Sequence, residues 1–363
     1  MALVRSSLKD LKVYKPGKPI EELRREFKLK EIYKLASNEI PFPPLYLKKV
    51  VLRELSSVNR YPEAGCFYLR NILAKRLKVK RDQLIFGNGS DELIVLALRT
   101  FVERGDSVLV GYPTFLIYEL QSKVHQAKVV RIPLVNYRYD LLKMAKAVDR
   151  HTKIVFIANP DNPHGSYVTH KELEGFLEKI PQNVLVFLDE AYYEFVDKKD
   201  YPDSLYFLKN RGNIIITRTF SKAYGLAGLR IGYGITTQKI ASLLNKVREP
   251  FNVNRIAQIC AYHALLNKKF LKKTKEYIKK EKFYLYQELR KLKLEFVESV
   301  TNFVLVNFKR DTKTLYNYLL RRGVIIRELS SWGMKNFFRV TVGLHKENSR
   351  FIRYLKEFLR RKE

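Results

Sequence analysis

The stretch NIIITRTFSKAYGLAGLR, residues 213–230, joins a short apolar run to a polar turn rich in glycine. A run of apolar and β-branched residues that ends in such a turn is typical of a buried strand. Six similar runs lie between residues 83 and 234, and helical patterns separate several of them. Strands that alternate with helices predict an α/β domain with a mostly parallel sheet of seven strands flanked by helices. The six runs are Gln83–Phe86, Ser107–Val110, Lys128–Ile132, Lys153–Ala158, Val184–Leu188 and Arg230–Gly234, and helices are expected to begin near Ser90, Phe115, Thr169 and Ser204.

From about residue 251 the pattern changes to long helices, three short apolar runs and a final helix. A smaller α+β domain at the C-terminal end is the natural interpretation. Residues 1–45 contain five prolines and look like an extended arm with a short helix. We therefore expect an N-terminal arm that is part of the small domain (1–45), a large domain (46–250) and a small domain (251–363). The three runs are Phe303–Phe308, Val324–Glu328 and Phe337–Val342.

Charge and cysteine content narrow the class of function. The 69 basic and 37 acidic residues give a net charge of +32, but the basic residues are spread along the chain. The densest stretch, residues 267–296, repeats Leu or Ile every seven residues, which indicates an amphipathic helix with a solvated cationic face. Cys66 and Cys260 are too few for a disulfide scaffold or metal cluster and suit a reducing cytoplasm. With no run near the roughly 18 apolar residues that span a bilayer, we expect a cytoplasmic protein that binds no metal, membrane or nucleic acid.

Polar and glycine-rich segments follow the predicted strands at the point where each strand ends. In open α/β sheets, ligands bind outside the carboxyl ends of the strands. We therefore expect these segments to form one site. They are GNGSDE (87–92), YPTF (112–115), NPDNPHG (159–165), DEAYYEF (189–195) and TFSKAYGLAGLR (219–230).

The segment GNGSDE has the composition of an anion site. Gly87 and Gly89 permit a tight turn, and Ser90 and Asp91 fall at the start of the predicted helix. Free backbone N–H groups and the helix dipole at that point favour an anion such as a phosphate. An ordinary helix cap is the alternative, because Ser and Asp are preferred there anyway.

Asp189 and Lys222 are the candidate reactive residues. Asp189 ends an apolar strand, where its carboxylate would hold the proton of a pyridine nitrogen, cap a helix or pair with a cation. A lysine that is partly desolvated and near other cationic groups is a better amine nucleophile. Thr219, Ser221 and Arg230 around Lys222 would make a cradle for a phosphate group.

Two further side chains would contact a ring oxygen of the same ligand. Asn162 is held in its loop by two X-Pro bonds, which restrict the backbone. Tyr192 follows Asp189 by three residues and would donate to a phenolate oxygen. A simple proline-rich turn is the alternative for the loop around Asn162.

The motifs NPDNPHG, DEAY and SKAYGLAGLR, in this order and spacing, resemble the fold-type-I aminotransferases of the aspartate aminotransferase superfamily over nearly the whole chain. The resemblance implies pyridoxal 5'-phosphate (PLP) as cofactor, with Lys222 as the lysine that forms a Schiff base with it and moves the proton. It implies that Asp189 binds the pyridine nitrogen and that Phe115 stacks on the ring. Asn162 and Tyr192 would contact the ring oxygen, and Ser90, Asp91, Thr219, Ser221 and Arg230 would surround the cofactor phosphate.

Within this superfamily the chain resembles the histidinol-phosphate aminotransferase family. The likeness rests on YKPGK (14–18), NE (38–39), RYPE (60–63) and the pair Arg327 and Arg339. That family transfers an amino group between L-histidinol phosphate and 2-oxoglutarate, which gives imidazole-acetol phosphate and glutamate in histidine biosynthesis. The likeness implies that Asn38, Arg327 and Tyr14 bind the substrate, the last two at its phosphate. Arg339 would bind the α-carboxylate of glutamate, and Tyr61 would reach the cofactor phosphate of the other subunit of a homodimer.

Two positions depart from the family pattern. His164 stands where many relatives have Thr, and Phe115 stands where Tyr is common, which removes a hydroxyl group. Two other enzymes remain alternatives: an aminotransferase for aromatic or many amino acids, and a threonine-phosphate decarboxylase. A nucleic-acid-binding protein on an inactive aminotransferase scaffold is the alternative from another class.

Overall fold

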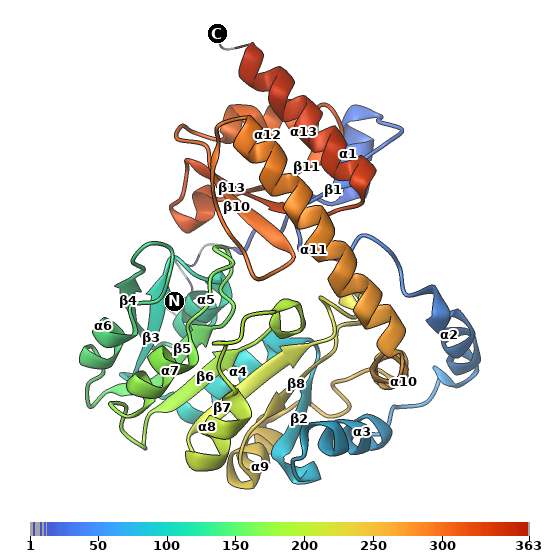
Figure 1. Ribbon diagram of the computed structural model, residues 1–363. Coiled ribbons are helices and arrows are strands. Elements are labelled where there is room, and N and C mark those ends of the chain that lie inside the picture. Colours follow the sequence, from blue (N-terminus) through green and yellow to red (C-terminus); the bar gives the residue numbers. More distant parts are fainter. Residues whose placement is uncertain (1–2, 4–7, 9–10, 12, 362–363) are drawn as a thin grey trace.

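A seven-stranded sheet lies at the centre of the larger part of the molecule (Figure 1). The structure is a computed structural model that describes residues 3, 8, 11 and 13–361. The five strands β4, β3, β5, β6 and β7 are parallel to one another, and β8 runs antiparallel between β7 and β2. This confirms the predicted α/β class and the mostly parallel sheet. In spatial order the strands are β2 (Leu84–Gly87), β8 (Gly232–Ile235), β7 (Ile214–Thr219), β6 (Leu185–Asp189), β5 (Thr152–Ala158), β3 (Ser107–Tyr112) and β4 (Lys128–Pro133).

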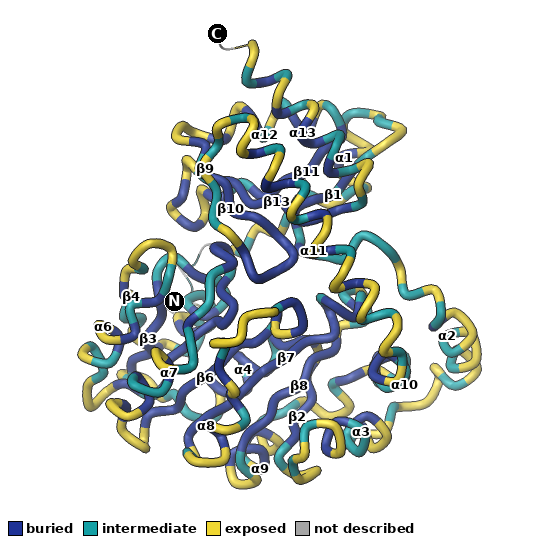
Figure 2. The backbone as a smooth tube through the Cα atoms, viewed as in Figure 1, coloured by how far each residue is buried: buried dark blue, intermediate teal, exposed yellow. Residues whose placement is uncertain are grey.

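Helices cover both faces of this sheet. Successive strand residues point to opposite faces, so Ile154 packs in one apolar core and Val155 in the other. One core takes residues from α4 (Ser90–Phe101), α5 (Leu116–Val124) and α9 (Gln238–Val247). The other takes residues from α3 (Phe67–Leu77), α6 (Leu141–Lys146), α7 (His170–Leu177), α8 (Ser204–Asn210) and α10 (Arg255–Leu266). Figure 2 shows the strands buried between layers whose outer surfaces are exposed.

A smaller antiparallel sheet forms the second part of the molecule, in the order β12 (Arg327–Glu328), β13 (Phe337–Thr341), β10 (Phe303–Asn307) and β9 (Glu295–Val297). Its core takes residues from the helices α11 (Lys268–Lys291), α12 (Lys313–Leu320) and α13 (His345–Arg360). The helix predicted over residues 267–296 is α11, and Ile278, Leu285 and Leu289 are buried on its apolar face.

The described residues of the N-terminal arm lie against the small part. The short helix is α1 (Ile20–Phe27), and strand β1 (Tyr33–Lys34) pairs in parallel with β11 (Val324–Ile325). The run predicted as one strand over residues 324–328 is therefore two strands, because β11 pairs with β1 whereas β12 pairs with β13 in the other sheet. The helix α2 (Lys48–Glu54) then leads to the large part. Residues 1–2, 4–7, 9–10 and 12 of the predicted arm lie outside the described residues.

The predicted domain boundaries at 45/46 and 250/251 stay a prediction. The helix α10, which follows the second boundary, packs against α3 and α2 of the large part. Among the described residues, no helix is long and apolar enough to cross a membrane.

The two parts touch at a glycine of the NPDNPHG loop. The backbone N–H of Val300 donates to the carbonyl of Gly165 (2.9 Å). Gly165 has φ +78°, and a Cβ atom there would collide with the Ser299 side chain. The Lys282 ammonium holds the neighbouring turn by donating to the carbonyls of Ser299 (2.5 Å) and Thr301 (2.8 Å). Glycine at 165 is therefore required both by the backbone conformation and by this contact.

We predict that Gly165→Ala lowers the free energy of unfolding by about 2 to 5 kcal/mol, because a left-handed conformation costs about 1–2 kcal/mol and overpacking about 1–3 kcal/mol. Gly105→Ala is the matched control: Gly105 has φ +99° but no atom within 4 Å of its Cβ position. It should cost only the conformational share, about 1–2 kcal/mol. Urea unfolding of both variants measures the two effects. Equal losses would show that the Ser299 side chain moves aside at no cost, so that close packing at position 165 does not require glycine.

Candidate active site

A cavity of about 220 Å³ opens where the carboxyl ends of the large-sheet strands face the small part. Its lining includes every predicted site residue except Tyr61. It also contains residues that the sequence analysis did not select, among them Ser37, Tyr118 and Trp332. The predicted residues in the lining are Tyr14, Asn38, Ser90, Asp91, Phe115, Asn162, Asp189, Tyr192, Thr219, Ser221, Lys222, Arg230, Arg327 and Arg339.

Lys222 lies in the turn after β7 and presents its amine to the cavity. Its Nζ donates to the carbonyl of Ser37 (3.2 Å) and lies 5.7 Å from the centre of the Tyr192 ring. Burial, together with the nearby Arg339 cation, lowers the pKa of the Lys222 amine to about 8. The neutral, nucleophilic amine is therefore populated much closer to neutral pH than that of an ordinary lysine.

Asp189, at the end of β6, is a buried carboxylate with a cluster of donors. It accepts from the hydroxyl of Tyr118 (2.7 Å), the hydroxyl of Thr217 (3.3 Å) and the backbone N–H of Ala191 (3.2 Å). Burial raises the pKa of Asp189 to about 6, so the carboxylate is ionised at neutral pH. This arrangement holds a negative charge at the base of the cavity, where it can bind a protonated ring nitrogen. Tyr118 lies within an ordinary helical pattern on α5, which carries no signal of this contact.

The start of α4 and the turn after β7 form a cradle for an anion. The N-cap residue of α4 is Gly89, which has no side chain with which to cap the helix, so the first N–H groups, beginning with Ser90, are not capped by it. The Arg230 guanidinium lies beside them and donates to Asp91 (3.3 Å) and Ser221 (3.5 Å). A Cβ atom at Gly89 would lie 2.5 Å from Arg230, so glycine there keeps the cradle open. These groups fit the phosphate of the predicted cofactor.

Asn162 and Tyr192 both line the cavity and are each held by a second side chain. The Asn162 side-chain oxygen accepts from Arg339, and the Tyr192 hydroxyl oxygen accepts from the amide of Asn38 (2.8 Å). The hydroxyl hydrogen of Tyr192 is thus available for an acceptor in the cavity. Asn38 in turn is tied to the small part through Thr341 (2.9 Å) and Asn302 (2.9 Å).

The loop that carries Asn162 is fixed from inside by Asp161. This buried carboxylate accepts from the hydroxyls of Thr114 (2.5 Å) and Tyr139 (3.1 Å) and pairs with the ring of His164 (2.5 Å). His164 is itself buried, so the residue that departs from the family pattern is a hydrogen-bonded part of the interior.

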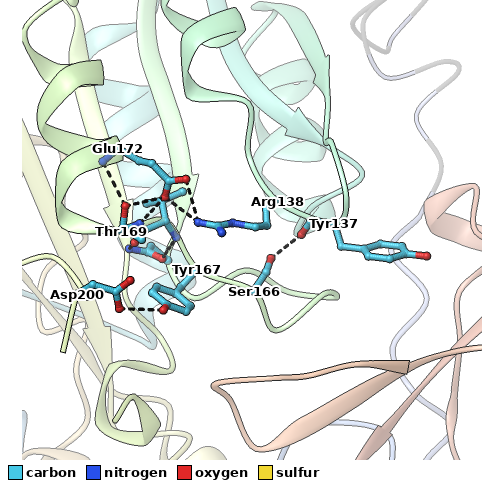
Figure 3. A network of polar contacts seen from close by, with 9 residues as sticks. Tyr137, Arg138, Ser166, Tyr167, Thr169, Glu172 and Asp200 are labelled. Atoms are coloured by element: carbon cyan, nitrogen blue, oxygen red, sulfur yellow. Dashed lines mark hydrogen bonds and ion pairs between the residues drawn. The ribbon is translucent and has the colours of Figure 1, made fainter. Parts of the chain in front are cut away.

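The outer side of the same loop is fastened to neighbouring elements (Figure 3). The Ser166 hydroxyl donates to the carbonyl of Tyr137 (2.5 Å), and the Tyr167 hydroxyl donates to Asp200 (2.9 Å). The α7 helix then begins with a capping box between Thr169 and Glu172, and Glu172 also binds Arg138. Contacts on both sides therefore restrict the position of Asn162.

Two buried arginines point at the cavity from the small part. Arg339 donates to the carbonyl of Ala36 (2.8 Å), its Nε has no partner, and burial lowers its pKa to about 10. Arg327 donates to the carbonyl of Lys15 (2.6 Å), and burial lowers its pKa as well. Among the described residues, neither arginine forms an ion pair with a carboxylate. A buried cation without a counter-charge is costly, so both are suited to bind an anionic ligand.

Tyr61 lies outside this cavity. Its side chain is 78% exposed and stacks on Phe251, with 4.7 Å between the ring centres. The role predicted for Tyr61 concerns the cofactor of another subunit and stays a prediction.

Comparison with known proteins agrees with this geometry. A family model described as aminotransferase class I and II matches residues 30–355. The histidinol-phosphate aminotransferase of Moorella thermoacetica is 43% identical over 98% of this chain and 92% of its own. Histidinol-phosphate aminotransferase 2 of Haemophilus influenzae is 41% identical over 97% of each chain. The crystal structure of the histidinol-phosphate aminotransferase of Sinorhizobium meliloti in complex with pyridoxal-5'-phosphate is similar with a TM-score of 0.92, at 27% identity over 100% of this chain and 99% of that one. The chain belongs to the class I and II aminotransferase family.

Proposed function

We propose that this enzyme transfers an amino group between L-histidinol phosphate and 2-oxoglutarate, with PLP as cofactor. The products would be imidazole-acetol phosphate and glutamate, a step of histidine biosynthesis. The observation that carries the proposal is the presence of two buried arginines, Arg327 and Arg339, in a cavity that already has a separate anion cradle; neither arginine has a carboxylate partner in the described part of the chain. The phosphate of the cofactor would occupy the cradle. The phosphorylated substrate and the dicarboxylate substrate would supply the anions that the two arginines bind. The relatives with this name, at 41–43% identity, support the same substrate.

The residues of the cavity fit PLP. The cradle of Ser90 and Arg230 would take the phosphate, Asp189 the pyridine nitrogen, and Phe115 the ring face. The hydroxyl hydrogen of Tyr192 would be donated to the ring oxygen. Asp91, Asn162, Thr219 and Ser221 complete the set that we assign to the cofactor.

PLP, when bound, withdraws electrons from the substrate Cα and makes its proton easier to remove. Asp189 would keep this effect strong by holding a proton on the ring nitrogen, since its carboxylate stays ionised above about pH 6. Lys222 would take the proton from Cα with its neutral amine and deliver it on the far side of the transferred nitrogen, which is the 1,3-proton shift of amino transfer. A pKa of about 8 suits this exchange, because both forms of the amine are populated near neutral pH.

The arginines would bind the two substrates in turn. Arg339 is a planar fork that matches a carboxylate, so it would hold the α-carboxylate of glutamate or 2-oxoglutarate. Arg327, near Tyr14 (5.9 Å from the guanidinium carbon to the ring centre), would hold the phosphate of histidinol phosphate. Asn38 would support the substrate from the side of Tyr192.

We predict that purified enzyme with histidinol phosphate and 2-oxoglutarate forms glutamate. Arg327→Gln should lower kcat/KM for histidinol phosphate by about 10²-fold or more, because a charge-assisted contact to phosphate is worth about 1.5–3 kcal/mol and its loss leaves a polar mismatch. The same variant should keep its rate constant for the glutamate half-reaction within about threefold. Coupled detection of glutamate measures the first reaction. Turnover of phenylalanine with none of histidinol phosphate would favour an aromatic aminotransferase, and carbon dioxide from threonine phosphate would favour the decarboxylase.

We further predict that the Lys222 amine titrates near pH 8, whereas an ordinary lysine titrates near about 10.4. Cofactor-free protein is pulsed with acetic anhydride across pH 6–11, and acetylation of Lys222 is quantified by mass spectrometry. The extent of labelling should reach half its maximum near pH 8. Because burial is the largest cause, denatured protein labelled in the same way should show the ordinary value. A folded midpoint above pH 10 would contradict the role of Lys222 as a base.

We propose that the enzyme is a cytoplasmic homodimer in which Tyr61 completes the partner's site. Exposed apolar side chains gather on the segments around α2 and α3, as expected of a surface that another subunit covers. They are Leu45, Leu52, Leu55, Val58, Tyr61, Phe67 and Tyr68. Cys66 and Cys260 are both free and buried, in keeping with a reducing compartment.

Mixing two impaired variants tests the shared site. If Tyr61 acts in trans, Lys222→Ala and Tyr61→Ala each lose activity, but their hybrid dimer contains one site with both native residues. Random exchange of subunits should restore about a quarter of wild-type activity, because half of the dimers are hybrids and each has one complete site. If mixing restores no activity although mass spectrometry shows that subunits have exchanged, Tyr61 belongs to its own subunit's site or to no site.

A further inference from the structure

Trp332 is the only tryptophan of the chain, and it lies in the wall of the cavity. It ends the short 3-10 helix η7 (Ser330–Trp332), which follows the strand β12 that carries Arg327. Its side chain is 2% exposed and belongs to a small apolar core with Leu305, Leu329 and Met334. A large rigid ring is thus anchored beside the arginine that we assign to the substrate phosphate.

The indole ring makes one contact with each part of the molecule. The guanidinium carbon of Arg327 lies over the ring, 4.8 Å from its centre, which is the range of a cation–π contact. Its Nε1–H donates to the carbonyl of Thr114 (2.8 Å) in the large part. Thr114 directly precedes Phe115, which we assign to the face of the cofactor ring.

Arg327 has few other contacts that set its direction. One guanidinium nitrogen donates to the carbonyl of Lys15 (2.6 Å), and the Tyr14 ring lies 5.9 Å away. Among the described residues no carboxylate pairs with it. A guanidinium binds an anion well when its planar fork is already oriented, because less side-chain freedom is then lost on binding. The Trp332 ring centre lies closer to this guanidinium carbon (4.8 Å) than the Tyr14 ring centre does (5.9 Å).

We propose that Trp332 is a specificity-determining residue: its indole face holds the Arg327 guanidinium in the orientation that selects phosphorylated over unphosphorylated substrates. The inference rests on the proposed function, since it needs a substrate with a phosphate group. It assigns two separate roles to the ring. The aromatic face sets substrate choice, and the N–H contact to Thr114 joins the two parts whichever substrate is bound.

Two substitutions separate these roles. Trp332→Phe keeps an aromatic face and removes the N–H donor, whereas Trp332→Leu removes both. The substrates are histidinol phosphate and histidinol, which differ only in the phosphate. In Trp332→Leu we expect kcat/KM for histidinol phosphate to fall about tenfold, mainly through KM, as the loss of a desolvated cation–π contact predicts. In the same variant the value for histidinol should change less than about threefold. In Trp332→Phe the ratio of the two values should stay within about threefold of wild type.

Met334→Ala is the matched control, because Met334 packs in the same small core and makes no contact with Arg327 among the interactions of the described residues. Met334→Ala should leave the ratio of kcat/KM for histidinol phosphate to kcat/KM for histidinol unchanged. Trp332→Leu could lower kcat/KM by the same factor for both substrates, or Met334→Ala could change the ratio of the two kcat/KM values as much as Trp332→Leu does. Either result would show that the ring only stabilises the fold, and the proposal would be wrong. If the wild type does not turn over histidinol phosphate at all, the proposed function fails instead, and the two failures are distinguishable.

The single tryptophan supplies a second readout that does not depend on turnover. Glycerol 3-phosphate is an unreactive phosphate ester, and its binding at Arg327 should alter the emission of Trp332 in the holoenzyme in a saturable way. Glycerol should have no effect, and Arg327→Gln should abolish the response. An unchanged response in Arg327→Gln would overturn the link between the ring and this guanidinium.

Discussion

The arrangement of the site depends on one constraint, that neighbouring parallel strands end at the same edge of a sheet. Such strands have to be buried on both faces, so they are mostly apolar, and polar residues such as Asp189 and Thr219 gather at or beyond their carboxyl ends. Asp189 ends β6, Lys222 follows the neighbouring strand β7, and Asn162 follows β5 on the other side of β6. The sheet thereby brings into one cavity residues that lie far apart in the sequence. Loops alone would not hold these side chains as precisely, since each would need its own supporting contacts.

The cavity gathers charges whose partners inside the protein are incomplete. Asp189 is ionised although burial raises its pKa to about 6, the Lys222 amine has a lowered pKa of about 8, and Arg339 keeps an Nε without an acceptor. Each of these groups is costly to bury when its partners within the protein are incomplete. Groups with perturbed pKa values gather where ligands or reacting atoms supply the missing partners. The contrast with Arg218 and Glu190 is informative, because that buried pair is fully matched (2.8 Å) and lines no part of the cavity.

The sequence was sufficient for the strands, the parallel sheet and the residues directly after each strand, because burial leaves a pattern of apolar runs with polar ends. It was insufficient where packing brings a residue to the cavity from an ordinary segment. Tyr118 reaches Asp189 from the middle of a helix, and Trp332 reaches Arg327 from a short 3-10 turn. The sequence also did not reveal that residues 324–328 form two strands. The first pairs with β1 and the second with β13, but the apolar run continues through the point where the pairing changes. The roles assigned to the site residues stay predictions, since proximity to the cavity does not establish what each side chain binds.

The departure of His164 from the family pattern bears on how the site is held, not on its chemistry. A threonine at this position has no ring nitrogen with which to pair with a buried carboxylate. Here Asp161 provides that carboxylate, and its two oxygens are shared among Thr114, Tyr139 and His164. One carboxylate oxygen of Asp161 accepts from both Thr114 and Tyr139, whereas among the described side chains the other is paired only with the His164 ring, so removing that ring would cost more than losing a hydrogen bond at the surface. The backbone carbonyl of Thr114 also accepts from Trp332. The network therefore runs from the Asn162 loop through Thr114, which precedes Phe115, to the cavity wall beside Arg327. Both departures, His164 and Phe115, therefore fall on or next to one continuous network that supports the cofactor and substrate sides of the cavity together.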